Sequence, residues 1–302
     1  MRPIVLTLLL WPALAAAGVV NVEFKFTPFT GDSTKEDHVE SVPGQVRILL
    51  NGVPSTDEPV QKQTLPVLFD EHEVAPSVWV PVESMGAAVR KGKNTIRFEF
   101  TPTDPKTQYT AQLRWASVTD QVREEGTRST NQADEGVESK AATGPVSIER
   151  TFTAEFAKDL PWHHYPAITR LSDGDKQQLA KLVADRVGWF APPYDAIYRA
   201  LDAQGGVKTA DVRKAKCLDA AHAAGVRFPA PAADELAFLT PGGPEVVVQR
   251  KDGSPLYMPD EAAFAKIKGE EKQMCAGVAL MVAFPPRLVV VKTPEGSWQS
   301  VS

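Results

Sequence analysis

The chain has 302 residues, of which 43% are hydrophobic and 24% charged, and its formal net charge at pH 7 is -5. These values are ordinary for a globular protein, and the length suggests one to three domains, with two as the default. The acidic balance and the absence of a strongly basic patch argue against a nucleic-acid partner.

The first 17 residues have the pattern of a secretory signal peptide. Arg2 gives a positive start, residues 4–11 are mostly apolar, and residues 15–17 are alanines that match a cleavage site. The apolar segment is too short to span a bilayer, and no later stretch is long and apolar enough for a membrane helix. We therefore expect the mature chain to begin at Gly18, to be periplasmic or secreted, and to have no membrane span.

Residues 18–158 contain about seven segments in which apolar and polar residues alternate, the pattern of half-buried strands. These segments are residues 20–26, 46–50, 65–69, 78–82, 94–100, 109–115 and 148–156. Turn signals such as Asn51-Gly52 separate them. The pattern predicts an N-terminal antiparallel β-sandwich.

Two segments of this region carry a family resemblance. They are Leu50-Asn51-Gly52-Val53 and residues 89–98, which read Val-Arg-Lys-Gly-Lys-Asn-Thr-Ile-Arg-Phe. Over residues 45–100 the chain resembles the jelly-roll or galactose-binding-like β-sandwich domains of secreted carbohydrate-active enzymes. The resemblance implies a sandwich that either binds a glycan or is purely structural. Both segments are mainly turn chemistry, and no binding residue of that family can be placed here.

Residues 121–145 interrupt the strand pattern, because Val122 and Val137 are their only large apolar side chains. A segment this polar buries too little surface to offset the ordering of its backbone. We expect a mobile hairpin loop at one edge of the sandwich, either functional or a simple solvated insertion.

A change of pattern divides the chain after this region. Residues 159–167 are predicted to be a linker, and residues 168–302 an α+β domain with helices followed by antiparallel strands. This order resembles the cystatin-like cone folds in architecture. The expected helices are residues 172–190, 193–204, 209–224 and 260–268, and the expected strands are residues 245–249, 255–258, 274–284, 288–291 and 298–301. Ser172 and Asp175 approximate a capping box for the first helix.

The predicted linker contains the most site-like short segment, with two aromatic residues and two of the five histidines. Its candidate ligand-binding residues are Trp162, His163, His164 and Tyr165. Imidazoles can bind metals, act as acids or bases, or form hydrogen bonds to ligands, and aromatic faces stack on sugar rings. Neighbours on an extended segment point to opposite sides, so the two histidines are not expected to share a metal. The segment either lines an interdomain cleft or wedges the domains together through its aromatic side chains.

The two cysteines, Cys217 and Cys275, are either disulfide-bonded or two buried free thiols. Export to an oxidising compartment favours pairing, which would stabilise the fold by about 4 kcal/mol in the chain-entropy model. Without nearby histidines they form no zinc signature. A Cys217 nucleophile assisted by His222 is a weaker interpretation, and His222 alone reads as a packed or surface histidine.

Acidic clusters give weaker signals. Residues 70–73 read Asp-Glu-His-Glu, and Asp104 and Asp120 could join them in space, but the spacing matches no metal loop. Residues 173–175, Asp-Gly-Asp, are better explained by helix capping than by calcium. We predict no metal site and no cofactor.

The sequence contains no nucleophile elbow, zinc-protease motif, phosphate loop or dinucleotide fingerprint. The leading hypothesis is therefore an exported, non-catalytic binding or interaction protein of the cell envelope, with an envelope protein or a glycan as partner. The alternatives are a carbohydrate-active or other hydrolase with acidic catalytic residues, and a structural subunit of an envelope assembly. The sequence does not specify the oligomeric state.

Overall fold

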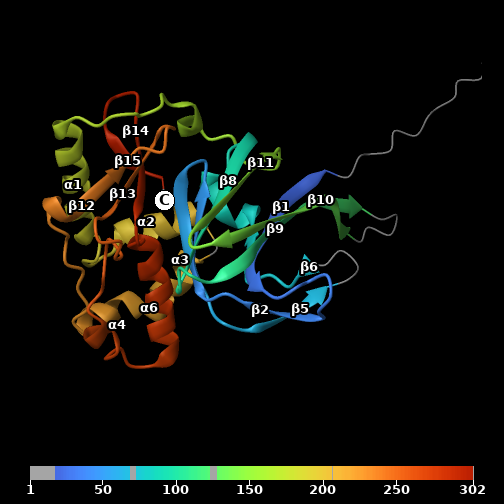
Figure 1. The fold of residues 1–302 in the computed structure, drawn as a ribbon. Coiled ribbons are helices and arrows are strands. Elements are labelled where there is room, and N and C mark those ends of the chain that lie inside the picture. The colour runs from blue at the N-terminus through green and yellow to red at the C-terminus, as the bar shows by residue number, and fades with distance from the viewer. Residues whose placement is uncertain (1–17, 69–72, 123–127, 206, 302) are drawn as a thin grey trace, which may run out of the picture. The chain divides into compact units, whose positions relative to one another are not determined.

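A computed structural model describes residues 18–68, 73–122, 128–205 and 207–301 (Figure 1). The chain forms two compact units. The second contains residues 158–302 and two short segments, Ile48–Thr56 and Thr95–Arg97. The signal peptide expected over residues 1–17 lies outside the described residues.

The N-terminal region of the chain, up to residue 157, is mostly antiparallel β-structure in two sheets, and the two short segments assigned to the second unit belong to its strands β3, β4 and β8. One sheet has the strand order β10-β9-β1-β2-β5-β6, with β7 also paired to β1, and the other has the order β11-β8-β3-β4. The elements are β1 (Val19–Thr30), β2 (His38–Ser41), β3 (Gly44–Leu50), β4 (Val53–Val60), β5 (Thr64–Leu68), β6 (Glu73–Val74), β7 (Val78–Pro81), the 3-10 helix η1 (Val82–Ala88), β8 (Gly92–Pro102), β9 (Gln108–Val122), β10 (Arg128–Thr143) and β11 (Val146–Ala154). Each of the seven segments expected from the alternating pattern coincides with a strand over most of its described residues.

Strand β1 organises the larger sheet. It pairs antiparallel with β9 along most of its length, and its opposite edge pairs first with β7 and then with β2. Its alternating residues Val22, Phe24 and Phe26 are buried, as the period of two requires.

An aromatic cluster holds the faces of the two sheets together. It contains Phe24 and Phe26 of β1, Phe98 and Phe100 of β8, Tyr109 of β9 and Phe152 of β11. The rings of Phe26 and Phe98 stack with centroids 5.5 Å apart, and Phe24 meets Phe152 edge-on at 5.3 Å. Such pairs add to the stabilisation that burial of their large apolar area provides.

The expectation of a loop over residues 121–145 is wrong for residues 128–143, because these residues form strand β10. β10 is an edge strand of the larger sheet, and its backbone pairs with β9 along its length except at a bulge between Ala133 and Gly136 (Figure 1). A polar strand is stable there because an edge strand needs only one neighbour, and its backbone rather than its side chains makes the contacts. Gly136 lies opposite Trp115, where a Cβ atom would overlap the indole ring.

The second unit contains helices followed by an antiparallel sheet of order β12-β13-β14-β15, as the pattern predicts at this level. Its elements are the 3-10 helix η2 (Pro161–His164), α1 (Asp173–Val187), α2 (Asp195–Gln204), α3 (Thr209–Ala215), α4 (Cys217–Ala223), the 3-10 helix η3 (Ala233–Glu235), β12 (Leu236–Leu239), β13 (Glu245–Arg250), α5 (Glu261–Phe264), α6 (Glu270–Ala283), β14 (Leu288–Lys292) and β15 (Trp298–Ser300). Val246, Val248, Leu288 and Val290 join the helices in one core.

Three expectations for this unit are wrong. Residues 274–283 belong to helix α6, and residues 274–284 form no buried strand. The buried residues of α6 recur at helical spacing, at Ala276, Ala279, Leu280 and Ala283, and apolar residues on its exposed face hide this period. Residues 255–258 form no strand. The helix expected over residues 209–224 is two helices, because Lys216 between them adopts a left-handed conformation with φ 52°.

Cys217 and Cys275 form a disulfide that joins α4 to α6, with a Cα–Cα distance of 6.0 Å. Of the two alternatives that the sequence leaves open, the structure contains the disulfide. The bond is consistent with an extracytoplasmic protein. Among the described residues no helix has the length and hydropathy to cross a membrane.

Replacing Phe98 with alanine is expected to destabilise the protein by about 3–5 kcal/mol, because it leaves a cavity in the aromatic cluster. Thr101→Ala, at an exposed position of the same strand, is the matched control and should change stability little. Urea unfolding of both variants measures the difference; equal stabilities would contradict the role given to the cluster.

Removing the disulfide through the double substitution Cys217→Ala/Cys275→Ala is expected to lower the free energy of unfolding by about 4 kcal/mol. Thiol labelling of the denatured wild-type protein should find no free cysteine before reduction and two after it. Full labelling without reductant would show that the bond is not formed.

Candidate functional site

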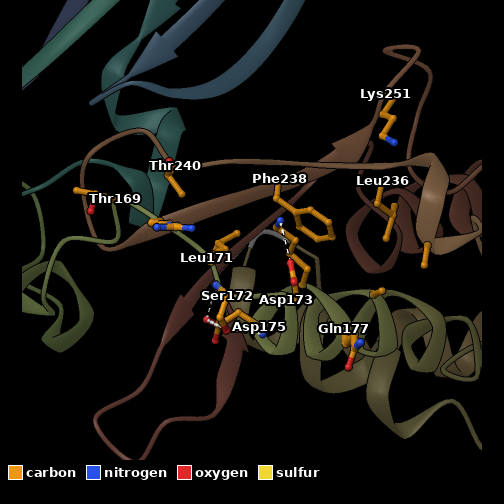
Figure 2. A pocket seen from close by; sticks show the side chains of 14 residues that line it. Thr169, Leu171, Ser172, Asp173, Asp175, Gln177, Leu236, Phe238, Thr240 and Lys251 are labelled. Atoms are coloured by element: carbon orange, nitrogen blue, oxygen red, sulfur yellow. Dashed lines mark hydrogen bonds and ion pairs between the residues drawn. The ribbon is translucent and has the colours of Figure 1, made fainter.

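The second unit contains an open cavity of about 1180 Å³ between helix α1 and strand β12. Figure 2 shows side chains of both elements facing this space. Its lining residues are Thr169, Arg170, Leu171, Ser172, Asp173, Asp175, Lys176, Gln177, Ala180, Ala233, Leu236, Phe238, Thr240 and Lys251. All of them belong to residues 158–302, so one unit builds the whole cavity.

The residues that line the two walls are spaced along the chain as the periods of a strand and of a helix require. Leu236, Phe238 and Thr240 are two residues apart and therefore lie on one face of β12 and its continuation. On α1, Asp173, Gln177 and Ala180 share one face at helical spacing. The floor is apolar and continuous with the core, since Leu171, Ala180 and Phe238 pack against it.

The first turn of α1 is capped as the sequence predicts. Ser172 Oγ accepts a hydrogen bond from the Asp175 backbone N–H at 3.1 Å, and the Ser172 N–H donates to Asp175 Oδ2 at 3.1 Å. Lys292 of β14 donates to Asp175 Oδ1 at 2.7 Å. The hydrogen bonds from Lys292 and then from Ser172 lower the pKa of the Asp175 carboxyl to about 2.

Two further contacts hold the C-terminal half of α1. The buried Arg186 donates from Nε to the Ala283 carbonyl at 2.6 Å and from a terminal nitrogen to Ser300 Oγ at 3.2 Å. Burial lowers the pKa of Arg186 to about 10. The Tyr257 hydroxyl donates to the Val183 carbonyl at 3.1 Å. Helix α1 is thereby tied to the sheet and to α6, which fixes this wall of the cavity.

The cavity contains an excess of positive charge. Its cations are Arg170, Lys176 and Lys251. Lys176 forms an ion pair with Asp173 at 3.4 Å, whereas the side chains of Arg170 and Lys251 form no ion pair or hydrogen bond within the described part of the chain. Lys292 already balances Asp175. Arg170 and Lys251 are therefore available to an anionic ligand.

The lining offers binding groups but no arrangement for nucleophilic catalysis. It contains no histidine or cysteine. The Ser172 hydroxyl donates to Asp175 at 2.7 Å, which superficially resembles a nucleophile with its base. A carboxylate with a pKa of about 2 is a very weak base, and both groups are engaged in capping the helix.

The candidate residues of the predicted linker do not line this cavity. Trp162, His163 and His164 lie in the short helix η2, followed by Tyr165, and not on an extended segment. His163 is buried, and its ring meets Trp162 edge-on at 4.2 Å. His164 is exposed, and its Nε2 lies 2.7 Å from Asp159 Oδ1. A ligand-binding role for the four residues stays a prediction.

The other candidates are explained by structure. His222 packs against the rings of Phe190 and Tyr194, and Cys217 is not a free nucleophile because it is disulfide-bonded. Of the acidic cluster at 70–73, Glu73 pairs with Arg114 and the other three residues lie outside the described residues. No group of three or more potential metal ligands occurs among the residues that the structure describes.

Sequence reasoning missed the residues that distinguish the cavity, above all Arg170, Phe238 and Lys251. The one available signal was the alternation of Leu236, Phe238 and Thr240, which predicts a strand face. No sequence signal predicts that this strand face lies opposite α1, because the two elements are some sixty residues apart in the chain and come together only in the folded structure.

Comparisons of the chain with protein-family models, with curated proteins and with solved structures found no match.

Asp175→Asn is expected to lower the free energy of unfolding by roughly 1 kcal/mol at neutral pH, because the carboxylate loses its contact with Lys292. The folded-state pKa of Asp175 is lowered, so its stabilisation is present above the ordinary value of 3.8 and is lost as the pH falls toward 2. The difference between variant and wild type should therefore shrink over that interval in urea unfolding.

Asp173→Asn is the control. The Asp173 side chain is 95% exposed, whereas that of Asp175 is 15% exposed. The control should leave stability nearly unchanged, and a loss as large as that of Asp175→Asn would contradict the assignment.

Proposed function

We propose that the protein is a non-catalytic ligand-binding protein that works outside the cytoplasm, periplasmic or secreted, and that the cavity between α1 and β12 is its binding site. The observation that carries this proposal is the composition of the cavity. An apolar floor, two available cations and several hydroxyl groups surround one open space. Clefts with apolar walls and a few convergent polar groups are the usual sites of ligand binding.

The geometry also indicates how a ligand is held. Phe238 and Leu236 offer apolar surface from the strand, while Gln177 and Thr240 provide an amide and a hydroxyl. Figure 2 shows Phe238 over the same space that Gln177 and Asp173 border. A ligand with an apolar or ring face and an anionic group therefore matches the site, and both an acidic glycan and an acidic segment of an envelope protein meet this description.

The N-terminal unit supports this role as a scaffold. Its two sheets meet face to face through the aromatic cluster, and we propose that they form a β-sandwich of the jelly-roll or galactose-binding-like kind. Its hydrogen-bonded and aromatic interior supports a structural role for this unit.

A second candidate function is participation in an envelope assembly. Met274, Val278 and Met281 form an exposed apolar stripe on α6, with Met274 67% and Met281 69% exposed. Exposed apolar patches mark protein contacts. A hydrolase is less well supported, because the lowered pKa of Asp175 makes this carboxyl unsuitable as a general acid and the Asp173 side chain is 95% exposed.

Gln177→Trp is expected to fill part of the cavity and to abolish ligand-induced stabilisation. Wild-type protein is screened by thermal shift with oligosaccharides, peptidoglycan fragments and acidic peptides at saturating concentrations, since binding to the native state raises the melting temperature. Any ligand that stabilises the wild type should leave Gln177→Trp unchanged.

Gln178→Trp is the matched control, since Gln178 is the exposed neighbour of Gln177 and does not line the cavity. It should respond to ligand like the wild type. A ligand that stabilises all three proteins equally binds elsewhere, and the cavity is then not the site.

A further inference from the structure

We propose that the ligand of this cavity is an extended peptide with acidic ends, which adds to the free edge of strand β12 as a fifth strand of the sheet. The proposal rests on the binding function assigned above and specifies its ligand. Addition of a strand to an open sheet edge is a general mode of peptide recognition, in which backbone hydrogen bonds provide affinity and pockets for alternate side chains provide specificity.

The first argument is the position of β12. It is the terminal strand of the four-stranded sheet and pairs only with β13, so one of its edges carries no neighbouring strand. The cavity lies along this strand, with α1 as its second wall (Figure 2). The cavity faces the side chains of Leu236, Phe238 and Thr240, so a peptide paired with the neighbouring edge of β12 would direct alternate side chains toward the cavity.

The second argument is the hydrogen-bond register. The Lys251 N–H donates to the Glu235 carbonyl at 2.9 Å, and Leu236 is opposite Arg250. Because bonded and non-bonded pairs alternate in an antiparallel ladder, Ala237 and Leu239 bond to β13, and Phe238 directs its N–H and C=O groups outward. The Leu236 N–H donates to the Ala233 carbonyl, so Leu236 offers only its C=O group. Within the described chain, no hydrogen bond to these outward groups of Phe238 is present.

The third argument is the contrast between two sheet edges. The exposed edge strand β10 carries Asp134, Glu135, Glu138 and Lys140, and such charges discourage pairing with other chains. Strand β12 reads Leu-Ala-Phe-Leu and carries no charge. These two edge strands thus differ in composition, and the uncharged one of the pair borders the cavity.

The fourth argument is charge complementarity. Lys251 lies at the Leu236 end of the strand, next to Glu235. Arg170 lies at the Thr240 end, because the Ile168 N–H donates to the Gly243 carbonyl at 2.8 Å. Figure 2 shows these ends marked by Lys251 and by Thr169. Five extended residues span roughly 16 Å, so a peptide of this length can place one carboxylate near each cation.

The test uses the full protein and a defined peptide probe. The probe is a pool of capped heptapeptides with glutamate at both ends and valine, threonine, isoleucine or tyrosine at the five central positions. Two further pools carry backbone N-methyl groups on alternate residues, either the even or the odd set, and a fourth replaces both glutamates with lysine. Binding is measured by calorimetry.

The unmodified pool should bind. N-methylation of one alternate set should weaken binding by about 10-fold or more, while the other set has little effect, because only one set faces β12. The lysine pool should bind at least about 10-fold more weakly than the glutamate pool. Arg170→Glu/Lys251→Glu should reverse this preference, whereas Lys266→Glu/Lys268→Glu, at exposed positions away from the cavity, should not.

Three results would overturn the proposal. If both N-methylated pools bind like the parent pool, no strand is added. If the charge-reversed variant keeps its preference for glutamate, Arg170 and Lys251 do not bind the acidic ends of the peptide. If no pool binds but a glycan stabilises the wild type and not Gln177→Trp, strand addition is wrong and the binding function stands; if no ligand binds at all, both fail.

Discussion

Helix α1 is the element on which the cavity depends, and charged contacts fix it near both of its ends. At its start, the Asp175 carboxylate meets Lys292 of β14; near its end, the Arg186 guanidinium reaches the last turn of α6 and Ser300 of β15. Both contacts are to elements more than ninety residues away in the chain. They set the distance between α1 and the sheet, and this distance leaves the space beside β12 open.

These two contacts differ in energetic character. The ion pair of Asp175 is partly solvated, so water screens it and its contribution to stability is small. Arg186 is buried, and removing a charge from water costs several kcal/mol unless hydrogen bonds replace the lost hydration. Its bonds to Ala283 and Ser300 and the indole of Trp189 at 4.2 Å replace part of it. The buried contact therefore specifies one position of the helix more than it adds stability.

The sequence predicted the elements far better than the cavity between them. Strands such as β1 and β8 were readable because one face of each is buried and the other is not. Helix α6 was misread because Met274, Val278 and Met281 make its exposed face as apolar as its buried one. Strand β10 was missed because its pairing is a backbone property that its polar side chains do not show. The cavity residues share no local pattern, since α1 and β12 are brought together by distant contacts.

The positions of the two cysteines in the chain determine when the disulfide can form. Both cysteines of the sequence lie in its last third, so the N-terminal sheets contain no thiol and can form before any oxidation takes place. The bond closes only when α4 and α6 are both present, after most of the chain has emerged. In a chain that enters an oxidising compartment N-terminus first, the β-region could fold while the helical unit still lacked its disulfide. Disulfide formation would then follow the folding of the β-region, and the unit that contains the cavity would be completed only after this oxidation.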